Sequence, residues 1–274
     1  ADIAETPGYP EVVGDIRLLR TLRAFDHDVE DSAEAFRAHL AVRCSHGLDA
    51  VRERIMAAWG EDLWNLRCEM LPHGELVSRY MPEAFVFAVT SAGDPVGLGL
   101  WGQGRPSAFV HEVEGWQDKF MEYYIFVNEA RMMLIDQASR EQGRLVHFVH
   151  IFDLENWSLV GNSDRSWTAF TTERTRPVGE TYHDCNSTFV AIRTTAWARM
   201  AYSVIKPILP KKVSDKIYLM DDDFAASSFA RELLDAETLE RLSRRAFSLP
   251  VRRSQEGRAV IRPRQSFACP VVVP

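Results

Sequence analysis

The sequence predicts an α/β fold in which a helical N-terminal lead precedes a β-sheet with covering helices. Three observations support this prediction. Residues 15–58 carry apolar side chains at helical spacing, and near Ala84 the apolar pattern changes to that of strands. From there, strand-like runs alternate with helical segments, which is typical of a sheet whose strands are joined by crossover helices. A length of 274 residues suits one or two domains.

The lead is expected to contain short helices with modest apolar faces. One stripe of its first helix collects four side chains, namely Ile16, Leu19, Leu22 and Arg23. The second helix is predicted to begin at Asp31 as N-cap, with Glu34 completing a capping box. Gly47 ends it, and residues 50–59 begin another helix. Such helices need a larger body to pack against.

The sheet region begins with a predicted hairpin. Residues 84–90 and 96–102 are the two strands, and a Gly-Asp-Pro turn joins them. Residues 145–154 form an almost unbroken apolar run, which is typical of a strand buried on both faces. The remaining predicted elements are a long helix at 115–140, a strand at 187–192, a helix at 197–205, a strand at 215–220 and a helix at 227–245.

Composition and charge exclude several classes of function. Acidic residues outnumber basic ones 39 to 32, so the net charge of −7 gives no support for a nucleic-acid partner. The four cysteines are far apart and form no C-x-x-C pair, which argues against a zinc site and favours reduced thiols in a cytoplasmic compartment. No apolar run reaches the ~18 residues of a membrane span. The first ten residues lack the basic start and apolar stretch of a signal peptide.

Two short motifs invite a catalytic or cofactor interpretation, and their contexts argue against it. His147 and His150 are predicted on a strand, where residues three apart point to opposite faces and cannot share one metal ion. Residues 97–102 satisfy G-x-G-x-x-G, but they lie inside a hairpin strand, and no helix follows to hold a pyrophosphate.

No nucleophile elbow of the G-x-S-x-G type occurs, and the run Asp221-Asp222-Asp223 is typical of a solvated loop. The sequence therefore predicts neither an enzyme nor a bound metal or cofactor. A nucleotide-dependent enzyme, based on the glycine motif, is the least favoured alternative.

Positive charge is unevenly distributed. Four of the five lysines, at positions 206, 211, 212 and 216, lie within residues 203–220, whereas the chain carries 27 arginines. A compact ammonium group suits a phosphate oxygen. Residues 241–264 carry eight arginines and one acidic residue, Glu256.

The second half of the chain is rich in large apolar side chains. Such a stripe usually forms a core, but it can line a pocket if the helix above the sheet can lift. Burial of an acyl chain contributes about 0.8 kcal/mol per CH₂ group, which would stabilise that arrangement.

Two blocks of the sequence resemble the CRAL-TRIO lipid-binding family. The first is LLRTLRAFDHDVEDSAEAFRAHLAVRC, which is similar to the helical lead of that family. The second starts at Tyr182-His183-Asp184 and runs through TFVAIR to WARMAYSVIKPILPKKVSDKIYLM. The blocks occur in the family's order, with a G-D-P hairpin and an F-D-L strand end between them. The resemblance covers roughly residues 15–235 and includes phosphatidylinositol-transfer proteins.

The resemblance implies a mixed sheet and an internal lipid pocket closed by a mobile helix at about 195–208. The implied domains are a lead at 1–75, a lipid-binding domain at 76–240 and an arginine-rich C-terminal tail at 241–274. It implies one bound hydrophobic ligand, such as a phospholipid, and contact with the surface of an anionic membrane. The function implied is to transfer or present that lipid between membranes.

Site residues follow from the family's motifs. Arg43 and Lys206 are the implied phosphate ligands, and Glu173 is the implied contact of an inositol ring. The expected apolar pocket residues are Phe148, Phe152, Phe170, Phe189, Trp197 and Met200. Lys211 and Lys212 are expected to face the membrane, at about 1 kcal/mol each.

The sequence also departs from the family's pattern. The family's W-R-K is Val42-Arg43-Cys44, its Y-P-E is Tyr182-His183-Asp184, and its closing F-G-G segment is absent. These departures favour an alternative in which the chain is a non-catalytic subunit of a larger assembly, with a vestigial pocket and a protein partner bound by the arginine-rich tail.

Overall fold

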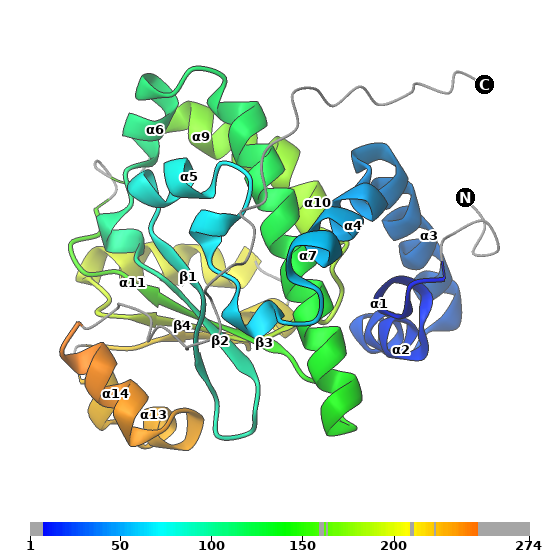
Figure 1. Ribbon diagram of the computed structural model, residues 1–274. Coiled ribbons are helices and arrows are strands. Elements are labelled where there is room, and N and C mark those ends of the chain that lie inside the picture. Colours follow the sequence, from blue (N-terminus) through cyan, green and yellow to red (C-terminus); the bar gives the residue numbers. More distant parts are fainter. Residues whose placement is uncertain (1–7, 159–161, 163, 209–210, 222, 246–274) are drawn as a thin grey trace.

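The computed structural model describes residues 8–158, 162, 164–208, 211–221 and 223–245. A five-stranded sheet forms its centre (Figure 1). The strands lie in the order β1 (Glu83–Val89), β2 (Pro95–Gly99), β3 (Phe148–Asp153), β4 (Asn186–Ile192) and β5 (Ile217–Leu219). The first pair is antiparallel and the other pairs are parallel. The α/β prediction and the implied mixed sheet are therefore confirmed.

The hairpin strand β1 carries a β-bulge between Ala84 and Ala88. In a regular strand, Phe85 and Phe87 would point to the same face, but the register with β2 shifts by two residues between Ala84 and Ala88, which interrupts the alternation. Phe85 accordingly joins the cluster on one face of the sheet and Phe87 joins the cluster on the other.

One face, called here the α7 face, is covered by helices that connect the strands. The longest is α7 (Trp116–Gln142), and α5 (Gly74–Tyr80) and α6 (Pro106–Glu112) pack beside it. Figure 1 shows α5, α7 and α11 (Ala196–Ile205) on this side of the sheet. The main hydrophobic cluster lies between α7 and the strands and includes Phe126, Leu134 and Phe148.

The opposite face is covered by α13 (Ser228–Leu233) and α14 (Ala236–Ser243). Sequence periodicity predicted one helix across residues 227–245, and this prediction was wrong. Leu234 is extended, and the carboxylate of Asp235 accepts a hydrogen bond from the Thr238 backbone amide at 2.6 Å. Asp235 is therefore the N-cap of a second helix, because capping competes with helix continuation at such a residue.

Four helices form the N-terminal lead: α1 (Pro10–Val13), α2 (Asp15–Ala24), α3 (Val29–His46) and α4 (Leu48–Trp59). The break at Gly47 is confirmed, with a left-handed φ of 62° that glycine tolerates. The predicted N-cap was one turn too late. Asp28 caps α3 by accepting from the Asp31 backbone amide at 2.9 Å, so Asp31 is the third helical residue.

The stripe predicted on α2 was also wrong. Its inner face is formed by Arg17, Arg20 and Thr21, all buried, whereas Leu19 is 41% exposed. The guanidinium of Arg17 donates to the Thr181 carbonyl at 2.6 Å, and that of Arg20 donates to the Val146 carbonyl at 2.5 Å. Periodicity missed this face because hydropathy treats arginine as a surface residue, although its donors can satisfy buried carbonyls.

The remaining elements are short. They are the 3₁₀ turns Leu63–Asn65, Cys68–Met70, Trp101–Gln103, Lys206–Ile208 and Phe224–Ala226, the helices α9 (Arg165–Phe170), α10 (Arg176–Glu180) and α12 (Lys211–Ser214), and a π-helical turn at Thr171–Thr175. The domain boundaries at 75 and 240 stay predictions. Residues 246–274 of the arginine-rich tail lie outside the described residues.

Candidate functional site

The α7 face of the sheet carries a row of aromatic rings. On β3, Phe148, His150 and Phe152 alternate onto this face, and Phe189 adds a ring from β4. The His150 ring stacks on Phe189 with centroids 5.3 Å apart and planes 9° apart, and it also lies 5.7 Å from Phe152. At the end of the row, Trp101 packs against Phe152, with the ring centroids 4.1 Å apart and the planes tilted by 32°. The row forms a flat apolar floor.

The glycines of the G-x-G-x-x-G motif make room for this floor. A Cβ atom on Gly97 would lie 2.8 Å from the Phe148 ring, and one on Gly99 would lie 3.0 Å from the Trp101 indole. Gly102 brings the backbone against the Glu155 carbonyl, where a Cβ would lie at 1.6 Å. These three glycines thus have a packing role, which accounts for the motif without a dinucleotide.

A cavity of about 300 Å³ lies where α7 and α10 meet the beginnings of β3 and β4. Its lining includes Tyr124, Asn128, Arg131, Phe148, His150 and Asn186. Two of these, Phe148 and His150, also belong to the aromatic row, so the cavity and the row share one sheet face. The cavity combines an apolar floor with a few polar groups, which is the usual character of a ligand site.

His150 is the buried polar group of the floor, with a relative exposure of 8%. Its Nε2 lies 3.0 Å from Oδ1 of Asn186. Burial is the main cause that lowers the pKa of His150, to about 3, and the nearby positive charge of Arg131 adds to this effect. The imidazole is therefore neutral at physiological pH. Since an amide oxygen accepts, Nε2 carries the proton and donates to Asn186.

Helix α11 covers the other half of this face and has two unlike sides. Ala198 faces inward and packs in a cluster with Leu154 and Ala191. The outward side presents Trp197, Met200 and Val204, which are 61%, 51% and 67% exposed. Trp197 and Met200 were predicted to line the pocket, and the structure instead places them on the solvent side. The spacing 197, 200, 204 puts all three on one stripe.

The other predicted apolar residues divide into two groups. Phe152 and Phe189 lie in the aromatic row, as expected of a pocket floor, and Phe148 lines the cavity. Phe170 belongs instead to an aromatic cluster between α7 and α9, with its ring 4.9 Å from that of Trp116.

Arg43, an implied phosphate ligand, is 4% exposed and bound to carboxylates. Its Nη1 donates to both oxygens of Glu129 at 2.9 and 3.0 Å, and its Nη2 donates to Asp49 at 2.6 Å. The Tyr182 hydroxyl donates to the same Glu129 at 2.6 Å. This arrangement gives Arg43 a structural role, and its contact with phosphate stays a prediction.

The three implied headgroup residues do not meet in the structure. Glu173 is exposed in the π-helical turn, whose form reflects Pro177, because proline has no N–H to donate to the Glu173 carbonyl. Lys206 is exposed at the end of α11. Within the described part of the chain, no hydrogen bond or ion pair joins Arg43, Glu173 and Lys206.

The clustered lysines have different environments. Lys212, expected at the membrane, forms an ion pair with Asp26 at 2.6 Å and donates to the Ala24 carbonyl, which ties it to the lead. Lys216 donates to the Asn186 carbonyl at 2.7 Å. Lys211 is exposed, as expected. Lys206 and Lys211 therefore fit a surface role better than Lys212 does.

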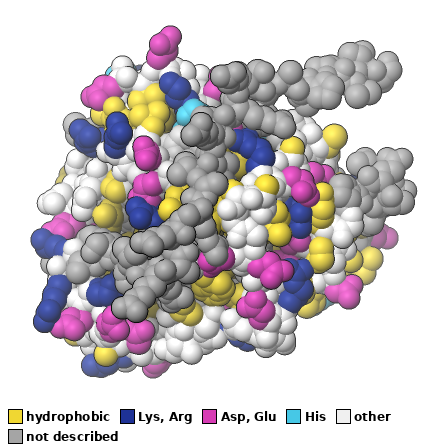
Figure 2. Space-filling view, in the orientation of Figure 1, with side chains coloured by type: hydrophobic (Ala, Val, Ile, Leu, Met, Phe, Trp, Pro, Cys, Tyr) yellow, Lys and Arg dark blue, Asp and Glu magenta, His cyan; other side chains and the backbone are white. Residues whose placement is uncertain are grey.

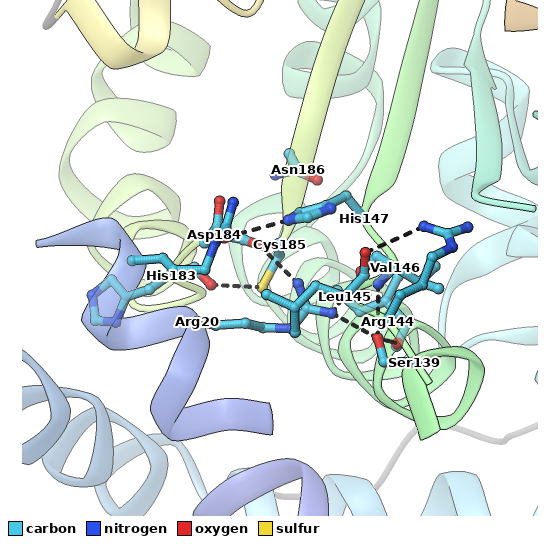
Figure 3. A network of polar contacts seen from close by, with 12 residues as sticks. Arg20, Ser139, Arg144, Leu145, Val146, His147, His183, Asp184, Cys185 and Asn186 are labelled. Carbon is cyan, nitrogen blue, oxygen red and sulfur yellow. Dashed lines mark hydrogen bonds and ion pairs between the residues drawn. The ribbon is translucent and has the colours of Figure 1, made fainter. Parts of the chain in front are cut away.

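Sequence reasoning missed the cluster of ion pairs around Asp184 (Figure 3). Its carboxylate pairs with Arg23 at 3.1 Å, with His147 at 3.3 Å and with Lys216 at 3.5 Å. Burial by itself would raise the pKa of Asp184, but these partners outweigh burial and lower the pKa to about 2. Figure 3 also shows Arg20 reaching this segment, where it donates to the Asp184 carbonyl at 2.8 Å. The only sequence signal was the Tyr182-His183-Asp184 motif.

Other classes of site can be compared with the described residues. His147 and His150 have separate partners, Asp184 and Asn186. In the ranges that the structure describes, no cluster of three or more His, Cys, Asp or Glu side chains is placed to hold a metal ion. None of the helices described is both long and apolar enough to cross a bilayer.

Comparison with known proteins agrees with the fold. The crystal structure of Sfh5 is similar, with a TM-score of 0.55 and 15% sequence identity, over 83% of this chain and 70% of that one. At this identity the likeness concerns the fold. A search of curated proteins found no match. The sequence profile of the CRAL/TRIO domain matches residues 101–240, which include the aromatic floor and α11. The chain belongs to the CRAL/TRIO domain family.

Proposed function

We propose that this protein binds one lipid on the α7 face of its sheet, under α11, and transfers or presents it at membranes. Membership of the CRAL/TRIO family supports lipid binding in general. The aromatic row supplies an apolar floor, and the cavity beside it supplies space and polar groups.

The observation that carries this proposal is the two-sided character of α11. Its inner side is small at Ala198, which packs with Leu154 and Ala191, and its outer side exposes three large apolar residues. A helix whose outer stripe is apolar gains free energy at a bilayer, about 1.5–3 kcal/mol for each such side chain that becomes fully buried. The same membrane contact would lift the helix and open the floor.

The charges around α11 assist this contact. Lys206 and Lys211 follow the helix directly and are exposed, so they can meet anionic lipids. On the face of the molecule in Figure 2, basic and acidic side chains of the described residues are interspersed. We therefore assign the main part of the attraction to the apolar stripe, with the lysines in a supporting role.

The proposed ligand is a phospholipid, with phosphatidylinositol as the first candidate. Lys206 is the proposed phosphate contact at the rim, because its ammonium has no ion-pair partner among the described residues. Replacement of Lys206 by Ala should weaken phosphatidylinositol uptake several-fold with the fold intact, as measured by uptake from vesicles and circular dichroism. Equal uptake by the variant and wild type would contradict the headgroup contact.

The membrane step is tested by vesicle binding and lipid transfer. Trp197→Ser combined with Met200→Ser should lower binding to anionic phosphatidylserine vesicles by at least about tenfold, because two exposed apolar contacts are lost. Ser203→Ala, on the same helix and also exposed, is the matched control and should bind normally. Unchanged vesicle binding by the double variant would contradict a membrane role for α11.

A further inference from the structure

His150, which lines the cavity, has a ring nitrogen whose hydrogen-bonding capacity is unused. His150 uses Nε2 for Asn186, and its Nδ1 has no hydrogen-bond partner among the described residues. The ring lies beside the rings of Phe152 and Phe189, and the three ring planes are within 12° of one another. The amide of Asn186 fixes the tautomer by accepting from Nε2. Nδ1 is therefore the unprotonated ring nitrogen, and its lone pair can accept a hydrogen bond from a ligand in the cavity.

The charges at the cavity are already balanced. Arg131 is paired with Glu83, and Arg176 at the cavity's edge is paired with Glu180 at 2.6 Å. An additional carboxylate or phosphate inside the cavity would not meet a free cation from these pairs, and burying an unpaired charge is costly. An uncharged donor has no such cost.

From this geometry we infer that the cavity binds an uncharged hydroxyl group of the lipid ligand, which donates its hydrogen bond to Nδ1 of His150. This inference rests on the proposed lipid-binding function and specifies which polar group the site selects. Two sources share the chemistry, namely an inositol hydroxyl of phosphatidylinositol and the terminal hydroxyl of a single-chain alcohol. In either case the aromatic row would hold the apolar part of the ligand.

The selectivity arises from the difference between a donor and an acceptor. An ether oxygen or a deprotonated carboxylate offers only lone pairs to the lone pair of Nδ1, which leaves two buried acceptors facing each other. An unsatisfied buried acceptor costs about 1–3 kcal/mol, and each 1.4 kcal/mol corresponds to about tenfold in affinity. The wild-type site should thus prefer an alcohol to its methyl ether by about tenfold.

The test measures displacement of a fluorescent fatty-chain probe from the delipidated full-length protein by 1-tetradecanol, tetradecyl methyl ether, myristate and phosphatidylinositol. His150→Phe keeps the stacked ring and removes both nitrogens. Asn186→Ala keeps the ring nitrogens and removes the tautomer lock, so it remains informative if the first variant folds poorly. Ser203→Ala, outside the cavity, is the control for general changes in probe binding.

If the site selects the hydroxyl of a single-chain alcohol, the wild-type protein should bind tetradecanol about tenfold more tightly than its methyl ether and than myristate. His150→Phe should abolish this preference. If the site selects an inositol hydroxyl, tetradecanol and its methyl ether should bind with equal affinity. His150→Phe should then weaken the binding of phosphatidylinositol by about tenfold. Asn186→Ala should reduce whichever preference is seen. If neither preference exists, or if both survive in His150→Phe, the inference is wrong although lipid binding stands. If no lipid displaces the probe, the proposed function fails with it.

Discussion

Arg43 and Glu129 form a buried ion pair that joins the lead to the lipid-binding domain. The guanidinium of Arg43, on α3, binds both carboxylate oxygens of Glu129, on α7, and the two side chains are 4% and 2% exposed. Tyr182 completes the arrangement by donating its hydroxyl to Glu129, so segments of the sequence more than fifty residues apart meet at one carboxylate. The family motif implied a phosphate contact for Arg43, and its partners in the structure are the carboxylates of Asp49 and Glu129.

Replacement of Glu129 by Gln should destabilise the protein by about 3 kcal/mol, because it leaves a buried guanidinium with only part of its compensating charge. Urea unfolding followed by circular dichroism measures this change. Glu240→Gln, in the exposed pair with Arg244, should cost less than about 1 kcal/mol. Equal small losses in both variants would show that the buried pair contributes no more than a surface pair.

Replacement of Arg20 by Met should loosen the lead. Arg20 donates to the carbonyls of Val146 and Asp184 and to the Ser139 hydroxyl, and loss of these bonds leaves buried acceptors unpaired, at about 2 kcal/mol or more. Hydrogen exchange should then accelerate in α2 and α3. Arg23→Met, which removes one half-exposed ion pair, is the control and should change exchange little. Similar exchange in both variants would contradict the anchoring role.

Replacement of Gly102 by Ala should strongly destabilise the fold, because its Cβ would overlap the Glu155 carbonyl at 1.6 Å and the backbone would have to move. Gly8→Ala is the matched control, since a Cβ there meets no atom within 4 Å. Thermal unfolding should show a lower midpoint for the first variant and an unchanged one for the second. A Gly102→Ala protein as stable as wild type would exclude the packing explanation of the motif.

Stability should fall as the pH is lowered from 7.5 to 5. Burial lowers the pKa of His150 to about 3 and that of His183 to about 4 in the folded state, against 6.5 for an ordinary histidine. Below pH 6.5 the unfolded chain therefore takes up protons that the folded chain does not, so this stability is present above pH 6.5 and lost as pH falls. Urea midpoints at pH 7.5, 6 and 5 measure the effect, and equal midpoints would contradict it.

Protonation of Asp136 changes the stability in the opposite direction to protonation of the two histidines. Burial raises its pKa to about 6 against the attraction of Arg140, so the folded state binds a proton before the unfolded state as pH falls below 6. Its protonation thus adds stability on acidification. Asp136→Asn removes this opposing contribution, and we expect the variant to lose more stability than wild type between pH 7.5 and 5.

The sequence predicted the parts of the fold that depend on apolar periodicity. The strand of residues 145–154 and the helix of residues 115–140 appear as β3 and α7, because their apolar patterns are long and consistent. The inner face of α2 was missed because buried arginines satisfy distant carbonyls, which no local pattern reveals. The break at Asp235 was missed because a cap can interrupt an otherwise periodic helix.

The site was predictable to a smaller extent. The family motif located α11, but the apolar residues of a helix do not show which of its sides faces the sheet, and Trp197 and Met200 are on the outer side. The strand position of His150 argued against a metal ligand, but the hydrogen bond of its ring with Asn186, from the next strand, could be seen only in the structure. Contacts between strands distant in the sequence carry this information.

The central claim is that a lipid binds between the aromatic floor and α11 when this helix lifts. The most direct measurement is native mass spectrometry of wild type and Ala198→Phe after incubation with phospholipid vesicles. The added ring fills the inner side of α11, beside Leu154 and Ala191, whereas Ser203→Phe adds the same ring on an exposed position. The account predicts one bound lipid in wild type and Ser203→Phe and none in folded Ala198→Phe. Full lipid loading of Ala198→Phe would contradict it.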